Sequence, residues 1–485
     1  MGCLSPLAHI FRAKHSSHSK NKKTSETAPT HTITLPRPSS QFISYLDKHP
    51  QTPTRKLLRP YLSYEAQLRQ EFVRADTEID DLANLVPIYN GQEDELKIRT
   101  IDRQVADSEK YLLPLKDHQR EVDGSLSIAP SLEDYRTNFE GFTHGTLAGL
   151  DWSNIVVAGS SALLPLLSER IDLNIQYDPA AEKPLETYYQ TTASWSDIDI
   201  FIYGLDSEEA AIRRILEVEA VLRKNQRLLS GQALSLRSEN AITFISPKWP
   251  FRHVQIILRL YRSISEILTG FDVDCACVAF DGKQVYSNPR GITAIATRTN
   301  TIDLSRRSPS YENRLWKYRN HNFEVYWDSL DRSRVKDINL DYDDDPRDLT
   351  GLARLIRSEE TLRRDKTRPY RLKRSLKRLD DGGDPTMTAP SGYATHEIPY
   401  GEKFTAERVR QFVIAHAKEP YVFGTIQEVT GQRPNRKRGK GKLPQKITFV
   451  KDNPGRQMIG SFYPLTADDW TKMAYEGYQA GNSIE

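Results

Sequence analysis

A regular alternation of strand and helix patterns between residues 150 and 290 is the feature that most constrains the fold. The segment NIVVAGSSALLPLL (154–167) predicts a short buried strand, a Gly-Ser turn and the start of a helix. The segment 205–225 carries the apolar stripe of an amphipathic helix. Together these patterns predict an α/β (α+β) core built on a mixed sheet. Further strands, rich in β-branched residues, are expected at 196–204, 241–246, 253–261 and 272–280.

The rest of the chain divides by composition into segments on either side of this core. Apolar residues spaced three and four apart after Lys56 predict a helical N-terminal extension. Beyond Arg298 the sequence is basic and irregular, and a linker-like stretch precedes the C-terminal region. The predicted segments are a disordered basic tail (1–50), the helical extension (55–145), the core (150–300), a helical and basic segment (301–380) and a smaller C-terminal α+β region (393–485).

The N-terminal tail is nearly free of acidic residues, since Glu26 is the first carboxylate of the chain. Its aliphatic density is too low to compensate the entropy lost on ordering, so disorder is predicted. The acid-poor start is also compatible with a mitochondrial transit peptide. Gly2 is compatible with acylation, although Pro6 stands where that motif has Ser or Thr.

The overall charge argues against a chain that binds polyanions along its whole length. Among 485 residues, 68 Lys and Arg face 65 Asp and Glu, which gives a formal net charge of +3. Contacts with RNA or DNA are therefore expected only at local basic runs, 363–378 and 433–442. The run 363–378 equally suits a solvated helix paired with the acidic run before it, or a localisation signal, and 433–442 is expected to be a basic loop between strands. No apolar run reaches the roughly 18–20 residues of a membrane helix, so no membrane span is predicted. Three cysteines cannot build a disulfide framework, and this favours an intracellular protein of the cytoplasm or nucleus.

The spacing that points to chemistry is Asp197-Ile198-Asp199 inside an apolar strand. Because side chains alternate along a strand, both carboxylates project from one face, about 7 Å apart. Two such charges repel unless a cation lies near them, and Mg²⁺ prefers carboxylate and phosphate oxygens. A second pair, Asp272 and Asp274, has the same spacing. Either residue is a candidate third ligand of a site for two metal ions.

The turn Gly159-Ser160-Ser161 supplies the other half of the predicted site. Glycine permits close approach of a ligand to the backbone, and the following helix presents N–H groups suited to phosphate. A Gly-Ser turn followed by a D-x-D strand resembles the nucleotidyltransferase superfamily, the group built like DNA polymerase β, poly(A) polymerases and oligoadenylate synthases. The resemblance covers about 150–290. A wider stretch also resembles a group of large eukaryotic proteins, some of them fused to ankyrin repeats.

The resemblance implies that Gly159 and Ser160 hold the phosphates of an NTP while Asp197 and Asp199 bind Mg²⁺. Two features depart from the family. Roughly 35 residues separate the turn from Asp197, more than is usual in the family, and Gln255 stands at the strand position where many relatives have the third carboxylate. An insertion over 172–194, expected to be a loop, would account for the extra length.

Three functions remain open from the sequence. The first is a Mg²⁺-dependent nucleotidyltransferase that moves a nucleotide from an NTP to a hydroxyl of RNA, of a second nucleotide or of a protein, with Asp274 or Asp272 helping to activate that hydroxyl. The alternative is a catalytically inactive module of the same fold that binds nucleic acid or a protein partner. A phosphotransferase that uses the same metal pair is a third option.

Overall fold

A computed structural model describes residues 33–74, 78–106, 108–167, 184–193, 196–229, 232–336, 349–364, 398, 405–417, 420–434, 439, 441, 443–450 and 463–477. Leu35–Glu485 form one compact unit. Most of the predicted N-terminal tail lies outside the described residues, but its end forms helix α1 (Phe42–Asp47), in which Phe42 and Leu46 are buried. None of the described helices combines the length and apolar composition needed to cross a bilayer.

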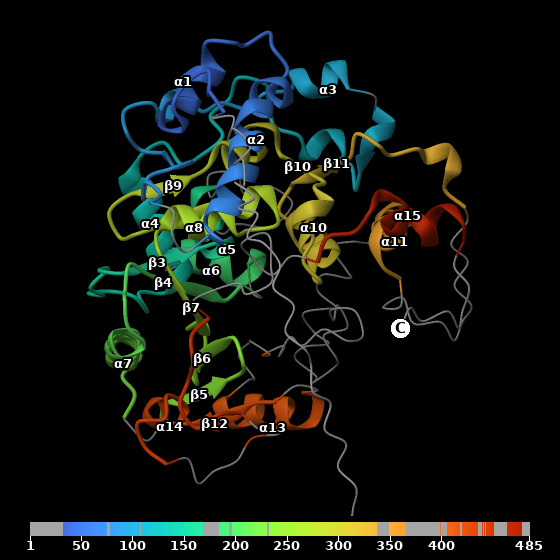
Figure 1. Ribbon diagram of the computed structural model, residues 1–485. Helices are drawn as coiled ribbons and strands as arrows, with labels where there is room; N and C mark the ends of the chain where they lie inside the picture. Colours follow the sequence, from blue (N-terminus) through green and yellow to red (C-terminus); the bar gives the residue numbers. More distant parts are fainter. Residues whose placement is uncertain are drawn as a thin grey trace, which may run out of the picture. The chain divides into compact units, whose positions relative to one another are not determined.

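A mixed sheet of nine described strands forms the centre of the compact unit (Figure 1). β4 and β7 are parallel, whereas the other neighbouring pairs are antiparallel. The predicted α+β class is therefore confirmed. In sheet order the strands are β1 (Val86–Pro87), β9 (Val285–Ser287), β8 (Val278–Phe280), β3 (Ile155–Ala158), β4 (Ile198–Tyr203), β7 (Val254–Tyr261), β6 (Ala241–Ile245), β5 (Leu234–Arg237) and β12 (Val422–Gly424).

The helix predicted after β4 is α7 (Glu208–Asn225), and its apolar stripe packs into the main core. Its first turn is capped by Ser207, whose hydroxyl accepts a hydrogen bond from the backbone N–H of Ala210. The other helices of this region are α4 (Leu132–Thr143), α5 (Ser160–Leu166), α6 (Pro184–Thr192), α8 (Ile264–Thr269) and α9 (Pro289–Thr297).

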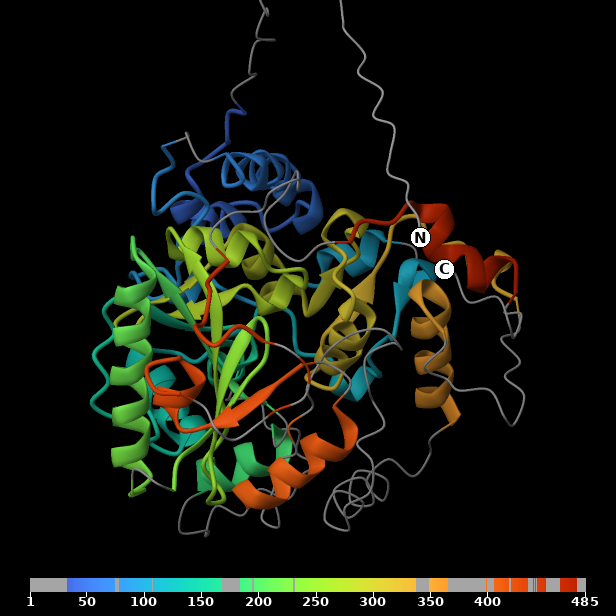
Figure 2. The same ribbon diagram turned by 60° about the horizontal axis from the view of Figure 1, so that its bottom comes forward.

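A second, three-stranded sheet combines two strands that follow the core in the chain with one that precedes it. Figure 2 shows the molecule from a second direction. Its strands, in sheet order, are β10 (Thr299–Thr301), β11 (Glu324–Tyr326) and β2 (Tyr111–Leu112). Helix α10 (Tyr311–Arg319) connects β10 to β11, and α11 (Gly351–Arg364) lies beside α15 (Ala467–Tyr475).

The C-terminal residues pack at two separate places (Figures 1 and 2). β12 extends the large sheet beside β5, accompanied by α13 (Ala406–His416) and α14 (Ile426–Val429). Helix α15 instead lies near α10, where the indole Nε1 of Trp470 donates to Glu312 at 2.8 Å. The segment boundaries predicted from composition stay predictions.

Three predictions of local structure need correction. The helical pattern after Lys56 is realised in α2 (Thr54–Glu71), whereas the described residues between 78 and 130 form short strands and helices of five residues or fewer. The segment 172–194, expected to be a loop, contains α6. The expected strand at 272–280 is a strand only in β8, because Asp274–Ala276 form a 3-10 turn.

Candidate functional site

The predicted Gly-Ser turn joins β3 to α5 and has the conformation that glycine favours. Gly159 has φ +78°, and its backbone N–H donates to the carbonyl of Val278 at 2.9 Å. Ser161 is fully buried; its hydroxyl donates to the carbonyl of Ala158 at 3.2 Å and accepts from the backbone N–H of Asp199 at 3.4 Å. One hydroxyl therefore connects the turn to the D-x-D segment.

The two carboxylates of the D-x-D segment lie at the start of β4. Asp197 directly precedes the strand and Asp199 is its second residue, and both side chains are half-buried. Ile198 and Ile200 alternate with them and are fully buried in the core. The predicted arrangement of both carboxylates on one side of the strand is therefore realised.

Helix α10 brings two cations to these carboxylates. The ammonium of Lys317 donates to the hydroxyl of Ser160 at 3.2 Å, although the two residues are 157 positions apart in the chain. Lys317 interacts electrostatically with both Asp197 and Asp199, and Arg314, one turn earlier on α10, interacts with Asp199. The turn, the strand and the helix therefore bring a hydroxyl, two carboxylates and two cations into one region, close enough for the charges to interact.

Burial dominates the ionisation of the acidic pair. Desolvation raises the pKa of Asp197 to about 6, and the cations Lys317 and Arg252 only partly offset it. Desolvation and the neighbouring charge of Asp197 likewise raise the pKa of Asp199 to about 6. Burial also lowers the pKa of Lys317, against the attraction of the two carboxylates. A bound cation would stabilise the ionised carboxylates, and a bound anion such as phosphate would stabilise the ammonium of Lys317.

The candidate third carboxylates are both bound by other side chains. Asp272 is buried, its oxygens accepting from the hydroxyl of Ser308 and, at 2.8 Å, from Arg314. Asp274 is buried as well, and it accepts from Arg290 at 2.9 Å and from the backbone N–H of Thr301 at 2.6 Å. Asp272 is thus linked to the site through Arg314, whereas Asp274 belongs to a separate network of buried charges.

The strand position opposite Asp199 is occupied by an amide. Gln255 on β7 is the register partner of Asp199, and its side-chain nitrogen donates to Thr243 at 3.3 Å. Among the described residues, no group of three or more His, Cys, Asp or Glu side chains is arranged to hold a metal ion. Two carboxylates nevertheless suit Mg²⁺, because this ion commonly takes one or two protein carboxylates and completes its shell with water and substrate phosphates.

The sequence reasoning missed the two cations and one buried arginine. Lys317 and Arg314 lie in RLWKYR, whose basic residues give no signal for a site more than a hundred residues earlier in the chain. Their spacing of three on a helix does predict that both side chains share one face. Arg252, just before β7, is wholly buried and contacts the residues that precede Asp197. The position of Arg252 next to an apolar strand is the sequence feature that could have indicated its burial.

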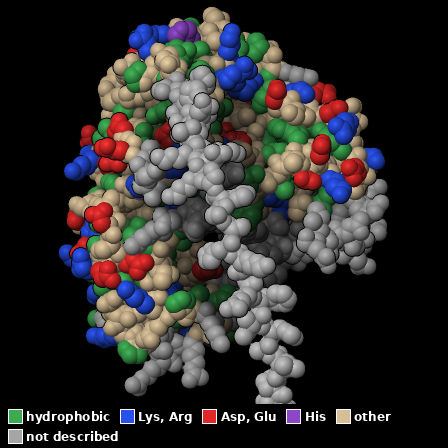
Figure 3. All heavy atoms as spheres, viewed as in Figure 1, with side chains coloured by type: hydrophobic (Ala, Val, Ile, Leu, Met, Phe, Trp, Pro, Cys, Tyr) green, Lys and Arg blue, Asp and Glu red, His purple; other side chains and the backbone are tan. Residues whose placement is uncertain are grey.

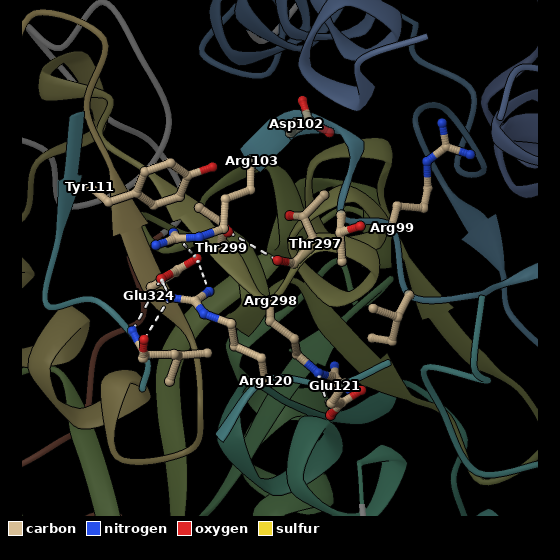
Figure 4. A pocket seen from close by; sticks show the side chains of 13 residues that line it. Arg99, Asp102, Arg103, Tyr111, Arg120, Glu121, Thr297, Arg298, Thr299 and Glu324 are labelled. Atoms are coloured by element: carbon tan, nitrogen blue, oxygen red, sulfur yellow. Dashed lines mark hydrogen bonds and ion pairs between the residues drawn. The ribbon is translucent and has the colours of Figure 1, made fainter. Parts of the chain in front are cut away.

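A small cavity of about 50 Å³ lies away from this site, below α3 (Ile101–Val105) and against the three-stranded sheet (Figure 4). Glu324 at its wall accepts from Arg103 at 2.8 Å and from Arg120 at 3.0 Å. Arg298 pairs with Glu121 at 3.0 Å. These arginines are engaged by carboxylates of the cavity wall, so the cluster is structural.

Charges of both signs are intermingled on the described part of the face shown in Figure 3. This agrees with the small net charge of the chain. The basic run 363–378 lies outside the described residues except for its first two, and 433–442 is described only in part. The predicted contacts with RNA or DNA therefore stay predictions.

Comparisons with known proteins give one family and one relative. A family model described as Gabija anti-defense 2 family protein (Gad2) matches residues 133–298. The uncharacterized protein R883 of Acanthamoeba polyphaga mimivirus is 30% identical over 234 residues, 46% of this chain and 46% of that protein. The chain therefore spans less than half the length of this curated relative. No solved structure matches this chain. The matched family segment contains the turn and the D-x-D strand but ends before α10.

Proposed function

We propose that this chain is a Mg²⁺-dependent nucleotidyltransferase that transfers a nucleotide from an NTP to a hydroxyl of RNA, of a second nucleotide or of a protein. The observation that carries the proposal is that the Ser160 hydroxyl, the Lys317 ammonium and the Asp197 and Asp199 carboxylates lie at one edge of the sheet, where β3 ends and β4 begins. This combination offers hydrogen-bond donors for phosphates together with carboxylates for a divalent cation.

In the proposed reaction the acceptor hydroxyl oxygen bonds to the α-phosphorus of the NTP. The bond from that phosphorus to the bridging oxygen breaks, pyrophosphate leaves, and the hydroxyl proton passes to solvent. Lys317 and Ser160 would bind the β- and γ-phosphates and orient them. Asp197 and Asp199 would hold Mg²⁺, which supplies positive charge against the developing charge on the phosphate oxygens.

The test is labelling of acceptors by the full chain with each NTP in the presence of Mg²⁺. RNA, DNA and the chain itself serve as acceptors, and every NTP is used once with label in the α-phosphate and once in the γ-phosphate. Label that enters only from the α-phosphate and is lost with EDTA supports nucleotidyl transfer. Label only from the γ-phosphate identifies a phosphotransferase. The absence of both, together with no binding of Mg²⁺ and NTP by calorimetry, contradicts the proposal.

Replacing Lys317 by methionine tests whether its ammonium binds the phosphates of the NTP or instead takes the place of a metal ion beside the carboxylates. If Lys317 binds phosphate, Lys317→Met weakens binding of Mg²⁺ and NTP roughly 10- to 100-fold, the value of a hydrogen bond to a charged group. If Lys317 instead substitutes for a metal, the variant binds Mg²⁺ alone more tightly than the wild type does. Calorimetry with Mg²⁺ alone and with both ligands distinguishes these results. Lys446→Met is the control, because Lys446 is exposed and pairs with Glu209.

Thermal stability is expected to respond to Mg²⁺ in a pH-dependent way. Because the pKa of Asp197 and Asp199 is raised to about 6 in the folded chain, their ionisation opposes folding, and their contribution to stability is lost as pH rises through 6. Bound Mg²⁺ relieves this cost only where the carboxylates are ionised. At a fixed Mg²⁺ concentration, tenfold above its Kd at pH 7.5, Mg²⁺ should raise Tm by roughly 2–4 °C at pH 7.5 and by much less at pH 5, where its affinity is lower. An equal shift at both pH values would contradict the assignment.

The second candidate is a binding module of the same fold without catalysis. Two observations favour it: Lys317 already supplies a cation to the carboxylates, and Gln255 stands opposite Asp199 where a third carboxylate is expected. The description of the matching family names an action against the Gabija defence system. An inhibitory role would be served equally by an enzyme and by a binding module, so the labelling and calorimetry decide between them.

A further inference from the structure

The buried side chain of Arg252 contacts the backbone just before β4. Arg252 precedes β7, which is the parallel neighbour of β4, and its side chain is inaccessible to solvent. The two segments are joined here by the backbone, since the N–H of Ile198 donates to the carbonyl of His253 at 3.0 Å. Asp197 and Arg252 therefore each directly precede one partner of this hydrogen bond, at the starts of two neighbouring strands.

The guanidinium of Arg252 donates four hydrogen bonds to main-chain carbonyls. Its Nε donates to Phe142 at 2.7 Å, one terminal nitrogen donates to Ala193 at 2.5 Å and to Ser196 at 2.9 Å, and the other donates to Tyr189 at 2.9 Å. The ring of Phe142 lies against the charged group, with its centroid 4.1 Å away. One side chain thus joins the end of α4, the end of α6 and the residue directly before Asp197.

These carbonyls need a donor for a simple reason. The last carbonyls of a helix have no partner within the helix, and a cation is favourable at a helix C-terminus. Tyr189 and Ala193 lie at the end of α6, and Ser196 follows as the chain turns into β4. A planar guanidinium can satisfy several carbonyls at once in a fixed geometry, which an ammonium cannot do.

We infer that Arg252 is a positioning residue of the proposed site: it holds the backbone carbonyls of Tyr189, Ala193 and Ser196 and thereby positions the carboxylate of Asp197. The inference rests on the proposed function for its chemical consequence, whereas the backbone role stands by itself. Mg²⁺ demands near-ideal octahedral geometry, so a ligand whose backbone moves loses affinity. Groups that orient metal ligands typically contribute 10- to 100-fold to metal affinity or activity.

The test compares Arg252→Lys with Arg99→Lys in the full chain. Arg99 is a matched control, because its guanidinium also donates to several main-chain carbonyls, those of Leu46, His49 and Thr52, in the N-terminal region. Hydrogen exchange followed by mass spectrometry should show faster exchange over 189–200 in Arg252→Lys only. Calorimetry should show a Kd for Mg²⁺ in the presence of NTP that is roughly 10- to 100-fold higher in Arg252→Lys and unchanged in Arg99→Lys.

The two readouts separate failure of the inference from failure of the proposed function. Unchanged exchange over 189–200 in a folded Arg252→Lys chain overturns the positioning role, whatever the chain catalyses. Faster exchange with an unchanged Kd for Mg²⁺ also overturns it, because the fixed backbone would then not serve the ligand. If the wild type binds neither Mg²⁺ nor NTP, the proposed function fails, and the exchange result still decides whether Arg252 holds this backbone.

Discussion

Replacing Asp197 and Asp199 together by asparagine is expected to lower Mg²⁺-dependent transfer from an NTP by on the order of 10³-fold or more. Asparagine keeps the size and the polar character of each side chain but removes the negative charge. The backbone N–H of Asp199, which donates to Ser161, is unchanged by the substitution, so we expect the variant to keep the backbone geometry. The loss should therefore reflect charge and not misfolding. Transfer from α-labelled NTP by the double variant measures it.

Asp206→Asn is the control for this prediction. Asp206 is exposed, lies a few residues beyond the end of β4, and should leave transfer unchanged. The melting temperature of the double variant without Mg²⁺ should equal or exceed that of the wild type at pH 7.5, because two charges whose ionisation opposes folding are removed. A double variant that is folded and still transfers nucleotide at the wild-type rate would contradict the role of these carboxylates.

The parts of the site that the sequence predicts are those set by local pattern. The turn at Gly159 follows from glycine between a buried strand and a helix, and the shared face of Asp197 and Asp199 follows from the period of a strand. Both need only residues within a few positions of one another. Neither depends on how the later segments of the chain pack.

The parts that the sequence does not predict are set by tertiary contacts. Lys317 reaches Ser160 only because tertiary packing brings α10 to the start of α5, 157 positions earlier in the chain. Helix α6 lacks clear periodicity, and its C-terminal carbonyls bind the guanidinium of Arg252, a residue outside the helix. The alternating sequence around Asp274 predicts a strand, but Asp274 begins a 3-10 turn. Its carboxylate is bound there by Arg290 and by the backbone N–H of Thr301. Local propensity is overridden in each case by a distant partner.

The network that holds Asp274 also contains the most deeply buried ion pairs of the described chain. Glu65 on α2 accepts from Arg290 at 3.1 Å and from Arg306 at 2.9 Å, and each of these three side chains is at most 2% exposed. Arg290 in turn binds Asp274 at 2.9 Å. The network therefore joins the N-terminal helix to α9 and to the residues that follow β10.

Replacing Glu65 by alanine is expected to lower the free energy of unfolding by about 3–5 kcal/mol, because two buried guanidinium groups lose a partner. Burial by itself would raise the pKa of Glu65, but Arg290 and Arg306 outweigh it and lower the pKa below its usual value of 4.5. The contribution of Glu65 to the free energy of unfolding is therefore complete above pH 4.5 and is lost as pH falls through the lowered pKa. The difference in free energy of unfolding between wild type and variant should therefore become smaller in acid. Urea denaturation at pH 7 and at lower pH measures both effects.

Glu217→Ala provides the comparison, since Glu217 also pairs with an arginine, Arg214 at 2.7 Å, but its side chain is 60% exposed. The loss should be less than about 1 kcal/mol, because water already solvates the exposed Glu217 carboxylate. The buried Arg214 also keeps its hydrogen bonds to the carbonyls of Ser153 and Asp151 in the variant. The difference between the two variants therefore isolates the effect of burial. A Glu65→Ala chain that loses no more stability than Glu217→Ala would show that Arg290 and Arg306 find other partners, and α2 would then be attached to the core by its apolar face alone.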